Sequence, residues 1–369
     1  MKYYCKSCLN SYQVEHHHFK CDCGAALYLD FTGIHQKNDI EQSDFSMWRY
    51  RGAYPLARQD IKISFDEGLT PFTDINYHGY SLKIKQDYLL PTGSFKDRGV
   101  AMVTNFLNTF GVTQFTEDSS GNGGASYAGY CALGNIDCKI YVPAGTSLGK
   151  IAQMKVYGAD LIEVKGTRAD VTTAAMKGVD SSVYVGHNWH PLFIHGIKSV
   201  AYEMWEQNDF VAPKQVICVA GNGSMVSGMY IGFKELLNTN QISAMPRIFA
   251  IQSDHCNPLY RNFINDNSLA EGKLGIAEGI SVANPTRLNE VVEQINDTQG
   301  TIISVSDEDI RSALVDIGKK GFYIEPTSAT AFAGLNKLIE AGTIEKSDTT
   351  ALIISGNGLK ATDKIIPML

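Results

Sequence analysis

Apolar residues along this 369-residue chain follow two alternating patterns. Short continuous apolar or β-branched runs predict buried strands, and apolar residues spaced three and four positions apart predict helices. The predicted strands are 81–85, 139–142, 161–164, 215–220, 247–252 and 351–354. The predicted helices are 99–110, 124–133, 149–157, 198–207, 226–237, 307–319 and 329–341. Because continuous apolar strands alternate with helices, we expect an α/β fold with mostly parallel sheets covered on both faces.

Length and composition narrow the class of protein. A chain of 369 residues is long enough for two or three domains. Hydrophobic residues make up 44% and charged residues 19%, which is typical of a globular protein. The net charge is −7 and no basic block stands out, so we expect no nucleic-acid partner. Neither a membrane-length apolar run nor a signal-like start is evident, so we expect no membrane partner and a cytoplasmic location.

A lysine is placed at a predicted helix start in segment 91–99, which reads Pro-Thr-Gly-Ser-Phe-Lys-Asp-Arg-Gly. Ser94 is a candidate N-cap, and Asp97 favours the helix start. The helix macrodipole disfavours a cation at this end, so the amine of Lys96 loses its proton more readily and becomes a better nucleophile. The alternative is an ordinary surface lysine on a capped helix.

Three glycine-rich loops follow predicted strands or begin helices. The first contains Ser119, Ser120, Gly121, Asn122 and Gly123, and it presents backbone N–H groups suited to a carboxylate or phosphate. The amide of Asn122 could donate a hydrogen bond to a phenolate oxygen. The alternative for this loop is a tight turn chosen for packing.

The second loop contains Gly221, Asn222, Gly223, Ser224 and Met225. It lies between a predicted strand and a predicted helix, which favours phosphate binding. Its spacing to the next glycine misses the dinucleotide fingerprint by one residue.

The third loop, 355–360, begins at the end of the last predicted strand. A hydroxyl at Ser355 suits a neutral heteroaromatic nitrogen, whereas a carboxylate would favour a protonated one.

In their order along the chain, the lysine segment and the three loops resemble the threonine synthase family of fold-type II pyridoxal-phosphate enzymes. Three further segments, 67–71, 149–159 and 324–329, resemble the family's Gly-x-Thr-Pro, Gly-Lys-x-x-Gln…Gly-Ala and Glu-Pro-x-Ser-Ala elements. The resemblance implies two open, mostly parallel sheet domains of the tryptophan synthase β-like architecture. It divides the chain into a cysteine-rich module at 1–30, a large cofactor-binding domain at 31–98 plus 206–369, and a small domain at 99–205. A homodimer is implied by the resemblance alone.

The resemblance also implies the role of each site residue. Lys96 would hold pyridoxal phosphate covalently and then act as acid and base. Asn122 would donate to the ring oxygen, residues 221–225 would bind the phosphate, and Ser355 would face the pyridine nitrogen. The loop 119–123 would bind the carboxylate of an amino-acid substrate. The implied reaction is proton removal at the α-carbon followed by elimination or replacement at the β- or γ-carbon, by default O-phosphohomoserine to threonine and phosphate.

One departure from the family concerns the substrate. Relatives acting on O-phosphohomoserine carry Asn-Ser-x-Asn-Pro-x-Arg, and segment 187–193 here reads His-Asn-Trp-His-Pro-Leu-Phe. Phe193 therefore replaces an arginine that binds phosphate. His187 and Asn188 could still donate to a substrate, or could be structural. The alternatives are β-replacement, dehydration or deamination of serine, threonine or an O-phosphoserine-like substrate, and a non-catalytic cofactor-binding regulator.

Four of the eight cysteines lie near the N-terminus. Cys5, Cys8, Cys21 and Cys23 form two closely spaced pairs, which predicts tetrahedral structural zinc in a zinc-ribbon-like module. A module of 30 residues has too little core to fold without such help. The alternative is a degenerate ribbon that no longer binds metal.

Overall fold

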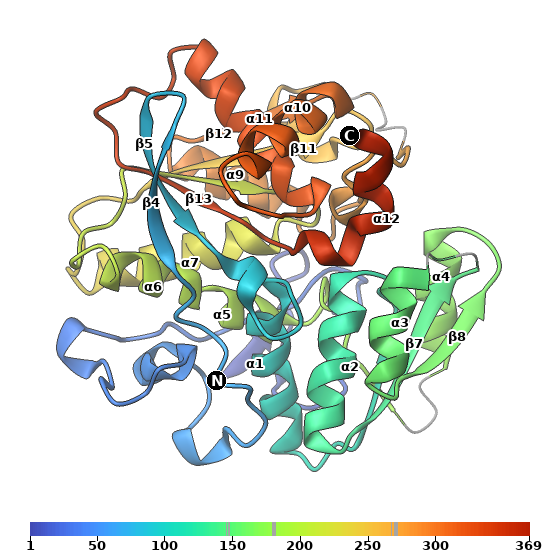
Figure 1. The fold of residues 1–369 in the computed structure, drawn as a ribbon. Coiled ribbons are helices and arrows are strands. Elements are labelled where there is room, and N and C mark those ends of the chain that lie inside the picture. The colour runs from blue at the N-terminus through green and yellow to red at the C-terminus, as the bar shows by residue number, and fades with distance from the viewer. Residues whose placement is uncertain (145, 147, 179–181, 267, 269–271) are drawn as a thin grey trace.

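A computed structural model describes residues 1–369 except 145, 147, 179–181, 267 and 269–271, and it also leaves the side chains of 148–150 undescribed. The described part of the chain contains three sheets (Figure 1). A six-stranded sheet and a four-stranded sheet are each flanked by helices, and a three-stranded sheet lies at the N-terminus.

The six-stranded sheet has the order β12-β11-β10-β13-β5-β4. Its strands are β4 (Phe72–Tyr77), β5 (Tyr80–Lys85), β10 (Gln215–Val219), β11 (Arg247–Ser253), β12 (Thr301–Val305) and β13 (Thr350–Ile353). All neighbours pair in parallel except β4, which is antiparallel to β5 at the edge. Parallel strands share one carboxyl edge, so the loops that follow β10 and β13 meet at the same edge.

Alternating residues of the central strands fill two separate cores, one on each face of the large sheet. Val216 and Cys218 pack with residues of α7 (Ser224–Asn238) and α9 (Leu288–Asp297). Ile217 and Val219 pack with residues of α10 (Asp307–Gly318) and α11 (Pro326–Glu340). Burial on both faces explains why β10 reads as a continuous apolar run. The remaining helices of this part are α6 (Ser199–Glu206), α8 (Pro258–Phe263) and α12 (Thr362–Ile365).

The four-stranded sheet is entirely parallel and has the order β8-β7-β6-β9. Its strands are β6 (Gln114–Glu117), β7 (Asp137–Pro143), β8 (Asp160–Val164) and β9 (Val183–Tyr184). The helices of this part of the chain are α1 (Lys96–Asn108), α2 (Asn122–Gly134), α3 (Leu148–Val156), α4 (Arg168–Lys177) and α5 (Pro191–Ile197). In Figure 1, α1 lies where the four-stranded sheet with its helices meets the part of the chain that contains the six-stranded sheet.

The N-terminal residues form an antiparallel sheet of order β2-β1-β3, from β1 (Lys2–Tyr4), β2 (Ser11–Gln13) and β3 (Tyr28–Leu29). A connector with short 3-10 helices follows: η1 (Lys37–Asp39), η2 (Met47–Arg49), η3 (Arg51–Ala53) and η4 (Arg58–Asp60). Among the described residues, the search for a helix long and apolar enough to cross a membrane finds none.

All six predicted strands and all seven predicted helices are confirmed, with ends that shift by a few residues. The sequence patterns missed seven strands (β1, β2, β3, β4, β6, β9 and β12) and five helices (α4, α5, α8, α9 and α12). The omission of β6 has a clear physical reason. This strand pairs on both sides and is buried, but three of its four residues are polar (Gln114, Thr116 and Glu117), so it shows no apolar run.

The prediction that Ser94 caps α1 is wrong. The helix begins at Lys96, and Phe95 stands at the N-cap position with helical dihedral angles. The Ser94 hydroxyl is buried and has no hydrogen-bond partner within the described part of the chain. Asp97 lies in the first turn as expected.

Candidate active site

The segment that carries Lys96 is fixed from two sides. The N–H of Phe95 donates to the carbonyl of Ser355 at 3.0 Å, so the helix start is tied to the loop after β13. The Asp97 carboxylate accepts from the Thr92 N–H at 2.7 Å and from the hydroxyls of Thr92 and Ser126 at 2.5 and 2.6 Å. Because Ser126 belongs to α2, these bonds hold Lys96 between a loop of the large sheet and a helix of the small one.

A buried ion network lies one residue beyond Asp97. Arg98 contacts Asp87 at 2.7 Å and Glu203 at 2.5 Å, and Lys85 contacts Glu203 at 2.5 Å. All four side chains are fully buried. The two cations balance the two anions, which is the condition under which buried charges are tolerated. The network ties the first turn of α1 to β5 and α6.

The surroundings of Lys96 favour its neutral amine. Burial lowers the pKa of Lys96 to about 8, although the carboxylates of Glu117 and Glu325 act in the opposite direction. The ammonium nitrogen lies 4.6 Å from the ring centroid of Phe95 and 5.5 Å from that of Phe193. An amine with this pKa is available as a nucleophile and as a base near neutral pH.

The loop 119–123 faces a carboxylate, that of Glu325, which belongs to the part of the chain around the large sheet. Gly124 brings the start of α2 so close that a Cβ there would lie 2.0 Å from the carbonyl oxygen of Ser119. This close approach explains why glycine follows Asn122 and Gly123. The amide of Asn122 donates to Glu325, 3.1 Å from Oε1 and 3.2 Å from Oε2.

The predicted phosphate loop and Ser355 lie at the same sheet edge. Ile217 of β10 pairs with Leu352 of β13, so the loops after these two strands are neighbours. Gly223 has φ +84°, and a Cβ there would lie 2.3 Å from Val291. With Gly223 as N-cap, the first-turn amides of α7 have no acceptor within their own helix and are available to an anion.

The other predicted members of this edge are also placed. The side-chain oxygen of Asn222 accepts from the N–H of Thr286 at 3.3 Å. The side chain of Met225 is buried in the core, while Ser224 begins α7. The hydroxyl of Ser355 lies 3.0 Å from that of Ser328, whose oxygen also accepts from the N–H of Gly356 at 2.8 Å.

Segment 187–193 brings two of its side chains to the lysine. The Nδ1 atom of His187 lies 2.8 Å from Oε1 of Glu117, and a Cβ on Gly123 would lie 2.9 Å from the same nitrogen. The rings of His187 and Phe193 are 5.6 Å apart. His187 therefore borders the 119–123 loop, and Phe193 borders Lys96. The side-chain oxygen of Asn188 is buried without a partner among the described residues.

Sequence reasoning missed Glu117, Glu325 and Ser328 as site residues. Glu325 and Ser328 belong to a segment already noticed for its resemblance, 324–329, which was a usable signal. Glu117 lies two residues before the first glycine-rich loop, and an acidic residue at the end of a buried strand was a weaker signal.

The four N-terminal cysteines converge as predicted. Their Sγ atoms all lie within 4.8 Å of one another, with 3.6 Å between Cys5 and Cys23 and 3.4 Å between Cys8 and Cys21. Four thiolates around tetrahedral zinc would be about 3.8 Å apart, given Zn–S bonds of about 2.3 Å. The donor set and its spacing therefore fit zinc.

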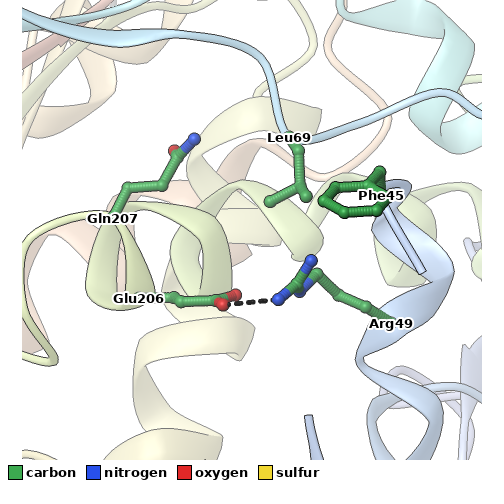
Figure 2. A pocket seen from close by; sticks show the side chains of 5 residues that line it. All are labelled: Phe45, Arg49, Leu69, Glu206 and Gln207. Atoms are coloured by element: carbon green, nitrogen blue, oxygen red, sulfur yellow. Dashed lines mark hydrogen bonds and ion pairs between the residues drawn. The ribbon is translucent and has the colours of Figure 1, made fainter. Parts of the chain in front are cut away.

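A surface pocket of about 480 Å³ is lined by a different set of residues (Figure 2). It is lined by Phe45, Arg49, Leu69, Glu206 and Gln207. Two of these residues, Arg49 and Glu206, form an ion pair of 2.8 Å, which Figure 2 shows as a dashed line. Its charges are already paired, and it contains no predicted site residue.

Comparison with known proteins agrees with this geometry. The model of a family described as "Pyridoxal-phosphate dependent enzyme" matches residues 63–356. The threonine synthase of Methanocaldococcus jannaschii is 32% identical, over 98% of this chain and 93% of its own. The chain belongs to the threonine synthase family of pyridoxal-phosphate-dependent enzymes. The threonine synthase of Methanosarcina acetivorans is 30% identical over 94% of this chain and 88% of its own.

Comparison with solved structures shows the same fold. A fungal L-serine ammonia-lyase from Rhizomucor miehei superposes with a TM-score of 0.72 at 18% identity, covering 82% of this chain and 97% of its own. The predicted α/β architecture of the fold-type II enzymes is thereby confirmed.

The residues present fit pyridoxal phosphate. The Ser94 hydroxyl, within the lysine segment, and Oε2 of Glu117, near Lys96, are buried atoms without a partner in the described chain. A helix N-terminus begins at Gly223, where a side chain would clash. A buried amine, unsatisfied polar atoms and an anion-binding helix start are the features that a phosphorylated pyridine aldehyde requires.

Proposed function

We propose that this chain is a pyridoxal-phosphate-dependent lyase of the threonine synthase type. It would remove the α-proton of an amino acid and then eliminate or replace a group at the β- or γ-carbon. The observation that carries this proposal is the placement of Lys96, a buried amine with a lowered pKa held between Ser355 and α2. The threonine synthase relatives support the same reaction type.

When bound, the cofactor supplies an electron sink for the charge that develops at the substrate α-carbon. Lys96 would hold it covalently through Nζ and then move the α-proton with the same nitrogen. Residues 221–225 would bind its phosphate at the start of α7. Asn122 and Ser355 would orient the ring, and the loop 119–123 would bind the substrate carboxylate with backbone N–H groups.

Two substrate classes are candidates. O-phosphohomoserine, yielding threonine and phosphate, is supported by the threonine synthase relatives. A serine- or threonine-like hydroxy amino acid is favoured by one observation at the site. Phe193 packs so closely on α1 that a Cβ on Gly99 would lie 2.5 Å from its ring, and it offers no charge to a phosphate.

A substrate panel tests the proposed reaction. The holoenzyme is incubated in deuterium oxide with O-phosphohomoserine, homoserine, serine, threonine and O-phosphoserine, and α-proton exchange is followed by NMR. Phosphate and ammonia release are measured in parallel. We expect α-proton exchange with at least one of these amino acids. Absence of exchange with all five would contradict the reaction class.

The cysteine cluster is proposed to hold one structural zinc ion in a ribbon-like module at 1–30. Support comes from the four converging sulfurs.

We also propose the division into a large domain at 31–98 plus 206–369 and a small domain at 99–205. The strands of the six-stranded sheet come from the first of these and those of the four-stranded sheet from the second, which supports the division. A homodimer is a proposal that rests on family resemblance, and light scattering of the purified protein tests it.

A further inference from the structure

We propose that Glu117 and His187 form a specificity pair that selects an amino acid with an uncharged side-chain hydroxyl over its phosphate ester. This inference rests on the proposed function, because it assigns the substrate class of the same site.

Glu117 is placed to face a ligand. It is the last residue of β6 and is fully buried, next to the glycine-rich loop that begins at Ser119. Its Oε1 atom is 2.8 Å from His187, whereas its Oε2 atom is buried and finds no partner among the described residues. An unsatisfied buried carboxyl oxygen is costly, so a donor on a ligand at this position would be favourable.

His187 completes the pair from the other side. Its Nδ1 atom is engaged by Glu117, and no hydrogen bond of its Nε2 atom to another described residue is observed. Its ring borders both Gly123 of the predicted carboxylate loop and Phe193 beside Lys96. A ligand whose carboxylate is bound by that loop would therefore extend its side chain past this imidazole.

An uncharged hydroxyl matches both groups. A hydroxyl has one proton to donate and two lone pairs to accept with, so it can satisfy Glu117 Oε2 and the imidazole together. A phosphate ester instead brings two negative charges and only acceptor oxygens to a site with a carboxyl group. In neither of its protonation states does that carboxyl group supply a positive charge.

The cations near the pair are already used. Lys96 is assigned to the cofactor. Arg168, the guanidinium whose charge reaches Glu117 and His187, is paired with Asp118 at 3.1 Å and also donates to the Asp118 carbonyl. The ring of Phe193, which lies beside His187 and Lys96, offers no positive charge. The pair therefore disfavours the phosphate ester, because it offers no positive charge to balance the two negative charges of the ester.

The test compares matched ligand pairs on the holoenzyme. Dissociation constants for homoserine against O-phosphohomoserine, and for serine against O-phosphoserine, are measured by calorimetry. The kcat/KM values for the same pairs are measured beside them. Wild type, Glu117→Gln and the control Glu163→Gln are compared. Glu163 is exposed on β8 of the same sheet, so this control removes an equal charge away from the site.

We expect wild type and Glu163→Gln to bind the hydroxy amino acids more tightly than the esters. In Glu117→Gln the ratio should move toward the esters by roughly tenfold or more, because the amide cannot ionise and always offers an N–H donor to a phosphate oxygen. Tighter binding of the esters by wild type would overturn the inference, as would an unchanged ratio in a folded Glu117→Gln protein. Both outcomes differ from absent α-proton exchange, which would contradict the proposed reaction instead. The wild-type ratio decides the question even if the variant does not fold.

Discussion

The side-chain amide of Asn122 donates to both carboxylate oxygens of Glu325, at 3.1 and 3.2 Å. Asn122 begins α2 beside the small sheet, and Glu325 precedes α11 over the large sheet. The bond therefore joins the two sheets across the site. Asn122 is also the proposed donor to the cofactor's ring oxygen, so we infer that cofactor binding replaces Glu325 as its acceptor.

Asn122→Ala should weaken cofactor binding by about tenfold or more, because a hydrogen bond to a charged oxygen is worth about 1.5–3 kcal/mol. Titration of the apoprotein with pyridoxal phosphate, followed by absorbance, measures the change. Asn296→Ala serves as control, since Asn296 is exposed on α9. Equal affinities of the two variants would argue against the assigned role of Asn122.

Cofactor attachment should depend on the protonation of Lys96. Burial lowers its pKa to about 8, and only the neutral amine is nucleophilic. The attachment rate should therefore rise as pH increases through about 8 and then level off, whereas an ordinary lysine would titrate at about 10.4. Stopped-flow absorbance of the apoprotein measures this profile.

The same profile should shift in a Glu325 variant. The carboxylate of Glu325 raises the pKa of Lys96, so Glu325→Gln should move the midpoint to lower pH. A midpoint above pH 10 in wild type, or a shift to higher pH in the variant, would be inconsistent with this electrostatic account.

Arg98→Met should lower the free energy of unfolding by about 3–5 kcal/mol, because Asp87 and Glu203 would share only Lys85 as a buried cation. Urea unfolding followed by circular dichroism measures the loss. Arg311→Met is the matched control, since Arg311 pairs with Glu308 on the exposed surface of α10 and should contribute at most about 1 kcal/mol. Similar losses in both variants would refute the importance of the buried network.

The cysteine module should contain zinc. We expect about one zinc ion per wild-type chain and a clear loss in Cys5→Ser, because one of four thiolate ligands is removed. Elemental analysis of the purified proteins measures the content. Cys256→Ala, which changes a buried cysteine outside the module, should keep its zinc. Unchanged zinc in Cys5→Ser would exclude the site.

Much of the fold could be predicted because its strands are buried on both faces. The run Val216 to Val219 is apolar throughout for that reason, and its pattern alone identifies a central strand. β6 could not be found this way. It ends in Glu117, whose hydrogen-bond partner His187 lies 70 residues further along the chain, and local periodicity does not reveal such a partner.

The site was predictable where backbone geometry fixes residue type. Gly223 has a positive φ, and Gly124 lies too close to the Ser119 carbonyl for a Cβ. Both positions therefore require glycine, and the sequence shows the loops by these residues. The contacts between loops could not be predicted. The bond from Phe95 to Ser355 and the pairing of Asn122 with Glu325 each join segments more than 200 residues apart, and only the folded chain brings them together.

The attachment of pyridoxal phosphate to Lys96 tests the account most directly. The cofactor-loaded protein is reduced with borohydride, digested and analysed by mass spectrometry, with Lys96→Ala and Lys360→Ala treated in the same way. Lys360 is a matched control because its amine lies 2.7 Å from the Thr92 carbonyl of the same segment. We predict that the cofactor mass is found on the peptide containing Lys96 in wild type and Lys360→Ala, and that it is missing from Lys96→Ala. A label on another lysine, or none in the wild-type protein, would contradict the account.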